Sequence, residues 1–186
     1  KTYNGVAILS RHPMQDVVRN IPGLDDEQAR VIAATLQTPQ GPVRLINCYF
    51  VNGQAPDSDK FAYKLRWLEA VHDWVQAELQ RHPELVVLGD FNIAPTDADN
   101  GDPAVIEGVT THVSAPERAA FQGFLDDGWT DVVRPHTPGP DVYTYWDYFR
   151  QRFERNRGLR IDFVLGSPSL SARVTGAFVD VDERAG

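Results

Sequence analysis

The sequence predicts an α/β protein of the α+β type, in which two mixed β-sheets pack together and helices lie outside them. Two observations point to this class. Strand-like apolar runs occur in pairs joined by short turns, and long helix-like segments separate other strands. This mixed order favours two sheets over a purely alternating parallel fold. The length of 186 residues suits one domain, which we expect to span residues 1–186 as a monomer.

The first strands form a hairpin. Residues 6–9 read as a short apolar strand, and a turn-rich stretch with Pro13 follows it. Residues 30–38 and 43–50 are rich in β-branched side chains, and the "PQGP" between them supplies a turn. We therefore expect two antiparallel strands here.

A long helix and a buried strand come next. Residues 58–82 place apolar side chains three and four positions apart, which predicts one helical face. Ser58 suits the N-cap, and Pro83 lies just beyond the end. Residues 84–92, "ELVVLGDFN", then read as a strand buried on both faces.

The last third contains one helix and two strands. Ser114 and Glu117 form a capping-box pattern that starts a helix, and Gly128 ends it. After a proline-rich loop and the aromatic stretch "YTYWDYF", residues 159–167 and 174–182 read as the final two strands.

Composition places the chain among soluble globular proteins. It is 42% hydrophobic and 24% charged, without a run of eighteen apolar residues or a signal-peptide pattern. We expect a cytoplasmic protein without membrane contact. The single cysteine, Cys48, lies in an apolar run, which suits a buried thiol and excludes a disulfide framework.

The charge has two opposing features. The net charge of −8 argues against a protein that simply coats nucleic acid. However, residues 150–160 contain five arginines, Arg157 among them, against one glutamate. This cluster suits a phosphate backbone, and it suits equally a solvated surface paired with nearby carboxylates.

The motif "GDFN" suggests a metal site. Asp90 and Asn92 alternate with Phe91, so a strand would place both polar side chains on one face. One carboxylate and one amide are oxygen ligands of the kind that Mg²⁺ prefers. The alternative is that both residues only cap the turn that follows.

Two further residues support a site. Asp162 is an acid between apolar strand neighbours and needs a partner, for which Arg160, a histidine or a metal are candidates. Tyr49 ends a strand, where its phenol can donate to a phosphate oxygen, or it is an ordinary core tyrosine. The histidines offer no metal pair, and serine-hydrolase and glycine-rich phosphate motifs are absent from the sequence.

Five motifs in order, "GVAILSR", "INCYF", "LGDFNIAPTDAD", "YTYWDYF" and "NRGLRIDFVL", extend over nearly the whole chain. Together they closely resemble bacterial exonuclease III, the exodeoxyribonuclease and abasic-site endonuclease family of the DNase I-like endonuclease/exonuclease/phosphatase superfamily. The resemblance implies a four-layer sandwich with a Mg²⁺- or Mn²⁺-dependent site at the strand ends.

The resemblance also implies catalytic roles. Asp90 would activate or orient the attacking water, and Asn92 would hold the phosphate and help to place the metal. Tyr49 would donate to the scissile phosphate. Asp162 would orient a catalytic histidine.

Substrate contacts follow in the same way. Tyr145, Leu159 and Ile161 match positions that form the apolar pocket for a flipped abasic sugar. Trp146 would support this pocket, and Arg30 matches a position near the DNA backbone.

Parts of the family pattern lie outside the chain. A first strand with an asparagine and a metal-binding glutamate would precede Lys1, and a Ser-Asp-His motif would follow Gly186. We therefore expect the fold to be incomplete at both ends and the natural protein to be longer. The isolated 186-residue chain should have little or no nuclease activity.

The expected function is metal-dependent phosphodiester hydrolysis on double-stranded DNA, at abasic sites and 3′ ends, in base-excision repair. Two alternatives stay open. One is a phosphatase or phosphodiesterase of the same superfamily that acts on a phospholipid or inositol phosphate. The other is a non-catalytic nucleic-acid-binding relative of the same fold.

Overall fold

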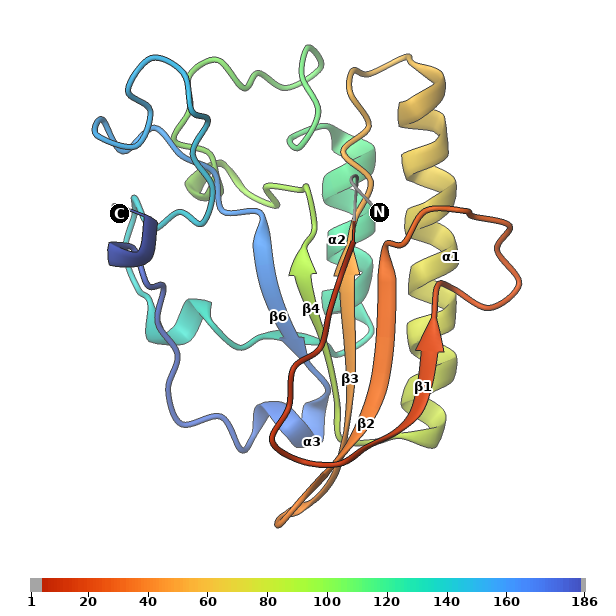
Figure 1. Cartoon of the computed structure of the whole chain (residues 1–186). Coiled ribbons are helices and arrows are strands. Elements are labelled where there is room, and N and C mark those ends of the chain that lie inside the picture. The colour runs from red at the N-terminus through yellow and green to blue at the C-terminus, as the bar shows by residue number, and fades with distance from the viewer. Residues whose placement is uncertain (1–4, 185–186) are drawn as a thin grey trace.

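The computed structural model describes residues 5–184, and its centre is one six-stranded mixed sheet (Figure 1). The strands are β1 (Met14–Arg19), β2 (Val31–Thr38), β3 (Gly41–Tyr49), β4 (Leu85–Asp90), β5 (Thr130–Asp131) and β6 (Asp162–Gly166). They lie in the order β1-β2-β3-β4-β6-β5. β3 and β4 are parallel, and the other neighbouring pairs are antiparallel.

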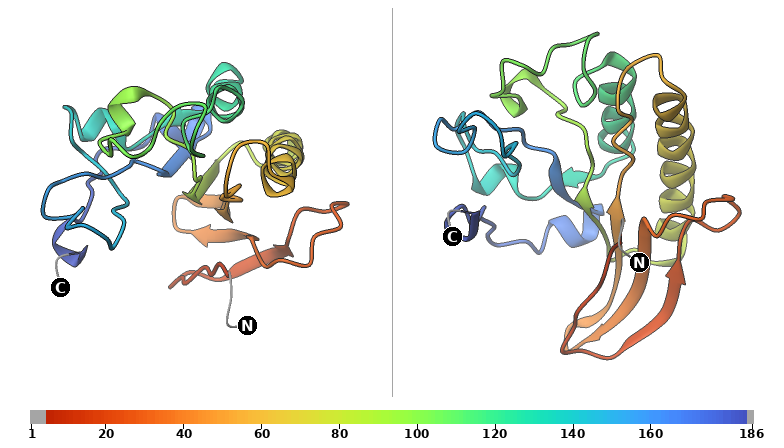
Figure 2. Two further views of the ribbon diagram at one scale, coloured as in Figure 1. Left: turned by 90° about the horizontal axis from the view of Figure 1, so that it is seen from above. Right: turned by 45° about the horizontal axis from the view of Figure 1, so that its top comes forward.

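Two long helices cover one face of this sheet. α1 (Asp59–Arg81) and α2 (Ala115–Asp126) lie on the same side, as the view from above shows (Figure 2). The shorter helical elements are α3 (Pro168–Ser171) and the 3₁₀ turns η1 (Asp97–Asp99), η2 (Arg134–His136) and η3 (Asp182–Arg184). In the described part of the chain, no helix has an apolar stretch long enough to cross a bilayer.

The main core lies between the helices and the sheet. Trp67 from α1 and Phe124 from α2 pack in one cluster with Ile46, Val87 and Phe163 from the sheet, and all five are almost fully buried. Burial of this apolar area supplies most of the driving force for folding. The opposite face of the sheet carries partly exposed side chains, and the segment before β1 crosses it, where Asn47 Nδ2 donates to the Ala7 carbonyl at 2.9 Å.

Local signals explain the main element boundaries. Ser58 caps α1 by accepting a hydrogen bond from the Phe61 amide, and the capping box of Ser114 and Glu117 starts α2. The β2–β3 hairpin closes at the pair Thr38 and Gly41, where Gly41 has φ 112°, a conformation that glycine adopts without strain. These predictions are confirmed.

The α/β class, the mixed sheet and the flanking helices are also confirmed, but strand positions differ from the predictions. The described residues form one sheet. Residues 6–9 and 174–182 contain no strand, because a strand needs a hydrogen-bonded neighbour and neither segment has one within the described chain. Residues 14–19, predicted as part of a turn-rich stretch, form the edge strand β1 with a register shift between Gln15 and Val18.

Candidate functional site

Three neighbouring strands bring Tyr49, Asp90 and Asp162 to one edge of the sheet. Tyr49 pairs with Asp90 across the parallel strands β3 and β4, and Asp90 pairs with Asp162 across β4 and β6. Side chains of paired residues leave the same face of a sheet. Their strand neighbours Cys48 and Phe163 are buried toward the helices, so the three polar side chains point to the opposite face.

The two carboxylates raise the proton affinity of the site. Burial, together with the nearby charge of Asp162, raises the pKa of Asp90 to about 7. The Asn92 backbone amide, which donates to Asp90 Oδ1 at 2.8 Å, and the charges of Lys64 and Arg30 oppose this shift. The Asp162 side chain is exposed to solvent on one side, but the protein packed around its carboxyl raises its pKa as well. A hydrogen bond with Thr144 acts in the opposite direction and lowers this pKa.

This pair of facing carboxylates is suited to a divalent cation. Two like charges on adjacent strand ends repel each other, and a bound cation would relieve that repulsion. Within the described residues, no group of three or more histidine, cysteine or acidic side chains gathers around them. Carboxylate oxygens are ligands that hard divalent cations accept, and such a cation can complete its shell with water and phosphate.

Asn92 does not continue the strand alternation expected from the sequence. β4 ends at Asp90, and Asn92 has φ 51°, which turns its side chain inward to 3% exposure. Its Nδ2 donates to the Phe50 carbonyl at 3.0 Å, and its Oδ1 accepts from Asn52 Nδ2 at 3.1 Å. The amide is therefore held in a fixed orientation beside the carboxylates, and its role in holding metal or phosphate stays a prediction.

His112 also lies at the site, although it was not among the residues predicted from the sequence. Its Nε2 lies 3.1 Å from Asn92 Oδ1, and its backbone amide donates to Glu117 Oε1 at 2.9 Å. Burial and the nearby charge of Lys64 lower the pKa of His112 to about 4, so the ring is neutral near pH 7. The only signal in the sequence was its position two residues before the capping box.

A buried ion pair between α1 and α2 lies behind Asn92 and His112 and holds their backbone. Lys64 on α1 and Glu117 on α2 are both fully buried and paired with each other. Lys64 Nζ also donates to the carbonyl of Asn92 at 2.7 Å. A buried lysine is stable only with partners of this kind, so the pair joins both helices to the loop that follows β4.

The predicted partner Arg160 does not pair with Asp162. Its guanidinium lies on the other side of the strand end, where Nε donates to Asp99 Oδ1 at 2.7 Å and Nη1 to Asp131 Oδ2 at 2.5 Å. Residues two positions apart share a face only on a regular strand, and β6 begins at Asp162, so Arg160 lies before it. The buried Asp99 and the partly buried Asp131 attract the arginine. Asp162 instead has Thr144 beside it, whose Oγ1 accepts from the Asp162 amide at 3.1 Å.

The expected sugar-pocket residues gather on neighbouring loops. Tyr145 and Leu159 form an isolated antiparallel bridge, with amide-to-carbonyl distances of 2.9 and 2.8 Å. Leu159 and Ile161 are buried in a small cluster with Ala94 and Val113. Tyr145 is 40% exposed beside them. The structure thus brings these three residues together, and their contact with a sugar stays a prediction.

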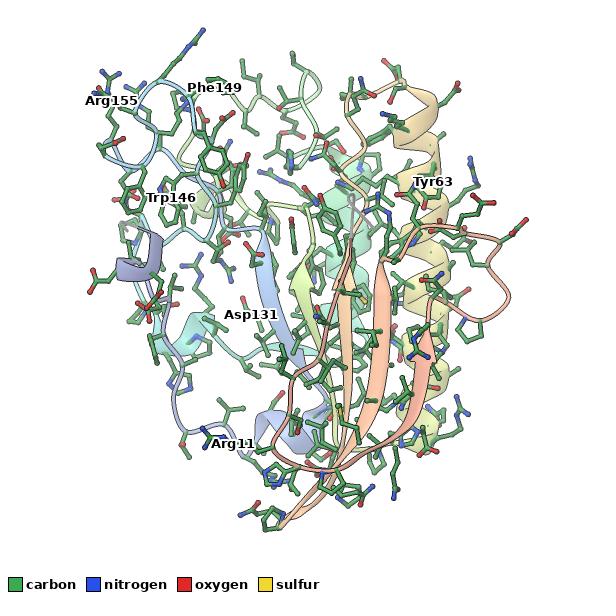
Figure 3. All side chains as sticks on the ribbon, viewed as in Figure 1. Arg11, Tyr63, Asp131, Trp146, Phe149 and Arg155 are labelled. Carbon is green, nitrogen blue, oxygen red and sulfur yellow. The ribbon has the colours of Figure 1, made fainter. Side chains whose placement is uncertain are left out.

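The aromatic and arginine-rich loop forms one corner of the molecule. Trp146, Phe149 and Arg155 lie on this corner (Figure 3). Trp146 is buried and donates from Nε1 to Asn156 Oδ1 at 3.1 Å, whereas Phe149 is 74% exposed. Arg157 is exposed. The loop therefore has a fixed aromatic base and a positively charged outer surface.

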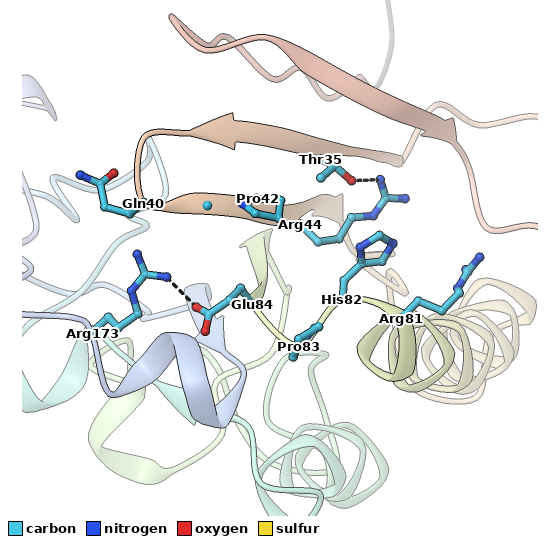
Figure 4. A pocket seen from close by; sticks show the side chains of 10 residues that line it. Thr35, Gln40, Pro42, Arg44, Arg81, His82, Pro83, Glu84 and Arg173 are labelled. Carbon is cyan, nitrogen blue, oxygen red and sulfur yellow. Dashed lines mark hydrogen bonds and ion pairs between the residues drawn. The ribbon is translucent and has the colours of Figure 1, made fainter.

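A cavity lies at the opposite end of the strands, near the start of β4 (Figure 4). It has a volume of about 230 Å³ and contains the side chains of Arg44, Arg81 and Arg173. Glu78 pairs with the first two of these arginines, and Glu84 pairs with the third. Each of the three arginines therefore already has a carboxylate partner, which favours a structural role for this cluster.

Comparison with known proteins agrees with this geometry. The chain matches the Endonuclease/Exonuclease/phosphatase family over residues 1–184. Exodeoxyribonuclease III of Haemophilus influenzae is 32% identical over 193 residues, which cover 100% of this chain and 72% of that protein.

Two solved structures share the fold. A 3′ phosphatase from Neisseria, bound to a product DNA hairpin, superposes with a TM-score of 0.88 at 47% identity. The match covers 95% of this chain and 67% of the Neisseria chain. An AP endonuclease from Archaeoglobus fulgidus gives a TM-score of 0.86 at 28% identity, with the same coverage of both chains. On the sequence match and the shared fold, this chain belongs to the Endonuclease/Exonuclease/phosphatase family, for which metal dependence is typical.

Proposed function

We propose that the protein hydrolyses phosphodiester bonds in double-stranded DNA, as a metal-dependent 3′–5′ exonuclease and abasic-site endonuclease of base-excision repair. The observation that carries this proposal is that Asp90 and Asp162 lie beside Tyr49 at the ends of three neighbouring strands. The support for DNA comes from relatives named exodeoxyribonuclease III and AP endonuclease and from a structural relative that binds a DNA hairpin.

Each polar residue has a distinct task in this reaction. Asp90 activates or orients the attacking water and takes its proton. The water oxygen bonds to phosphorus while the bond from phosphorus to the 3′ oxygen breaks. Tyr49 donates to a phosphate oxygen, and Asn92 holds the phosphate from its fixed position.

Asp90 and Asn92 are the residues that we expect to hold the cation. A bound Mg²⁺ or Mn²⁺ supplies charge neutralisation at the phosphate. Asp162 adds a second negative charge opposite Asp90 and makes the site more attractive to a cation. Tyr145, Leu159 and Ile161 would receive an abasic sugar, and a normal base would be too large for them.

The test is an assay of the natural full-length protein with three duplex oligonucleotides, which carry an abasic-site analogue, a recessed 3′ end and a 3′ phosphate. The third substrate is included because a relative is a 3′ phosphatase. We expect cleavage with Mg²⁺, no cleavage with EDTA, and a loss of about 10³-fold in Asp90→Asn. The exposed Asp25→Asn is the matched control and should keep full activity.

Other outcomes separate the alternatives. DNA binding without cleavage of any substrate would indicate the non-catalytic relative. Neither binding nor cleavage, with activity on an inositol phosphate or phospholipid, would overturn the DNA assignment.

A further inference from the structure

Arg30 is packed against the tyrosine of the site. It precedes β2, and its guanidinium carbon lies 5.1 Å from the centre of the Tyr49 ring. Nη1 donates to the Tyr49 carbonyl at 3.2 Å, and the Tyr49 amide donates to the Arg30 carbonyl at 2.8 Å. The arginine therefore holds both the ring and the backbone of Tyr49.

The same contacts leave little of Arg30 for a ligand. The residue is only 8% exposed, and Nη2 donates to Gln28 Oε1 at 2.6 Å. Its Nε is buried and has no hydrogen-bond partner among the described residues. An arginine that binds a DNA phosphate normally presents its guanidinium to solvent as a charged fork, which this packing prevents.

We propose that Arg30 is a positioning residue that acts through Tyr49, fixing the phenol at the edge beside Asp90, rather than a contact for the DNA backbone. The proposal rests on the proposed function, because Tyr49 matters there as the donor to the scissile phosphate. The stacked guanidinium restricts the ring, and its positive charge favours negative charge developing near the phenol.

The test is a double-mutant cycle in the natural full-length protein. Arg30→Met removes the charged guanidinium that stacks on Tyr49 and keeps a long, unbranched side chain. Tyr49→Phe keeps the aromatic ring and removes its hydroxyl. We expect Arg30→Met alone to lower kcat about 10-fold with KM changed less than about 3-fold. In the Tyr49→Phe background the same change should lower kcat by less than about 2-fold, because no hydroxyl is left to position.

The controls address charge and folding. Arg30→Lys keeps the charge without the planar fork and should recover only part of the lost kcat. If Arg30→Met does not fold, as judged by thermal unfolding, Arg30→Lys carries the same cycle. Arg19→Met changes an exposed arginine on β1 and should leave kcat and KM unchanged.

A direct backbone contact would give a different result. The effects of Arg30→Met and Tyr49→Phe would then multiply, KM would rise, and the slope of log affinity against log salt would fall by about one. That outcome overturns the proposal.

A second measurement does not depend on catalysis. With carbon-13 at the tyrosine ring carbon that bears the hydroxyl, the Tyr49 resonance, assigned through Tyr49→Phe, should shift in Arg30→Met and not in Arg19→Met. An unchanged resonance would contradict the positioning role. If the wild-type protein cleaves no DNA, the proposed function fails, while this resonance still decides whether Arg30 controls Tyr49.

Discussion

At the scale of single residues, the site combines unusual backbone with unusual proton affinity. Asn92 and His112 both have positive φ, 51° and 81°, and they contact each other. Non-glycine residues adopt such conformations at a cost of about 1–3 kcal/mol, which the surrounding structure must offset. Here the buried pair Lys64 and Glu117 hydrogen-bonds to the backbone of both residues and holds this conformation in place.

Asp90 gives a prediction about pH and stability. Its pKa of about 7 in the folded state lies above its ordinary value of 3.8, so the folded state binds the proton more tightly than the unfolded chain. The metal-free protein should therefore lose stability as pH rises from about 4 to about 7. Asp90→Asn should remove much of this loss and raise the free energy of unfolding at pH 8 by about 1–3 kcal/mol.

Urea unfolding of the metal-free protein at pH 5 and pH 8 measures this difference. The exposed Asp25→Asn is the control and should follow the wild type at both pH values. Asp162, whose pKa is also raised, contributes in the same direction, so some loss of stability should persist in Asp90→Asn. Equal losses of stability in Asp90→Asn and wild type would contradict the assignment.

Cys48 gives a prediction about reactivity. Its thiol is 1% exposed in the core, and burial raises its pKa. The thiolate is the reactive form, so an aromatic disulfide reagent should label native protein only as fast as it unfolds. Labelling should become rapid in urea. Fast labelling of the native protein would show that β3 opens locally.

At the scale of elements, an ion-pair cluster joins η1 and β5 to the segment that precedes β6. Arg160, at the start of the β6 region, lies between Asp99 of η1 and Asp131 of β5, and its guanidinium stacks 4.4 Å from the centre of the Phe163 ring. Arg134 adds a second bond to Asp99. The cluster fixes the backbone on which Leu159 and Ile161 lie.

Arg160→Met should therefore destabilise the protein by about 3–5 kcal/mol, because it takes a charged partner from the buried Asp99 and from the partly buried Asp131. Chemical unfolding measures the loss. Arg155→Met, at an exposed position of the same arginine-rich segment, should change stability by less than about 0.5 kcal/mol. A small effect of Arg160→Met would show that Arg134 alone is a sufficient partner for Asp99.

At the scale of the whole molecule, the distribution of charge matters more than its sum. The net charge is −8, yet Arg150, Arg155 and Arg157 are exposed in the same segment as the exposed aromatic side chains Tyr148 and Phe149. Figure 3 places Arg155 and Phe149 on one corner of the molecule. Such a corner can attract a phosphate backbone that the remainder of the surface repels.

Replacing Arg155 and Arg157 by alanine should test this corner. Both are exposed, and we expect DNA binding to weaken equally for different sequences, with the salt slope reduced by about one for each arginine. Fluorescence anisotropy at several salt concentrations measures both quantities. Arg66→Ala, an exposed change on α1, is the control. An unchanged slope in the double variant would place the DNA elsewhere.

The sequence by itself determined the elements whose signals are local. Helical spacing and the caps Ser58 and Ser114 placed α1 and α2, and the turn before Pro42 placed the β2–β3 hairpin. An apolar run that stops at an acid indicated Asp90, and an acid between apolar neighbours indicated Asp162; the structure pairs the two across β4 and β6, and their catalytic roles stay a prediction.

Tertiary structure alone decided the contacts between residues far apart in the chain. It turned Asn92 inward onto His112, paired Arg160 with Asp99 and Asp131, and packed Arg30 on Tyr49. It also left residues 6–9 and 174–182 without strand neighbours, although their pattern suits strands. Side-chain pattern records which residues prefer burial, but the partner that each one meets depends on how distant segments pack.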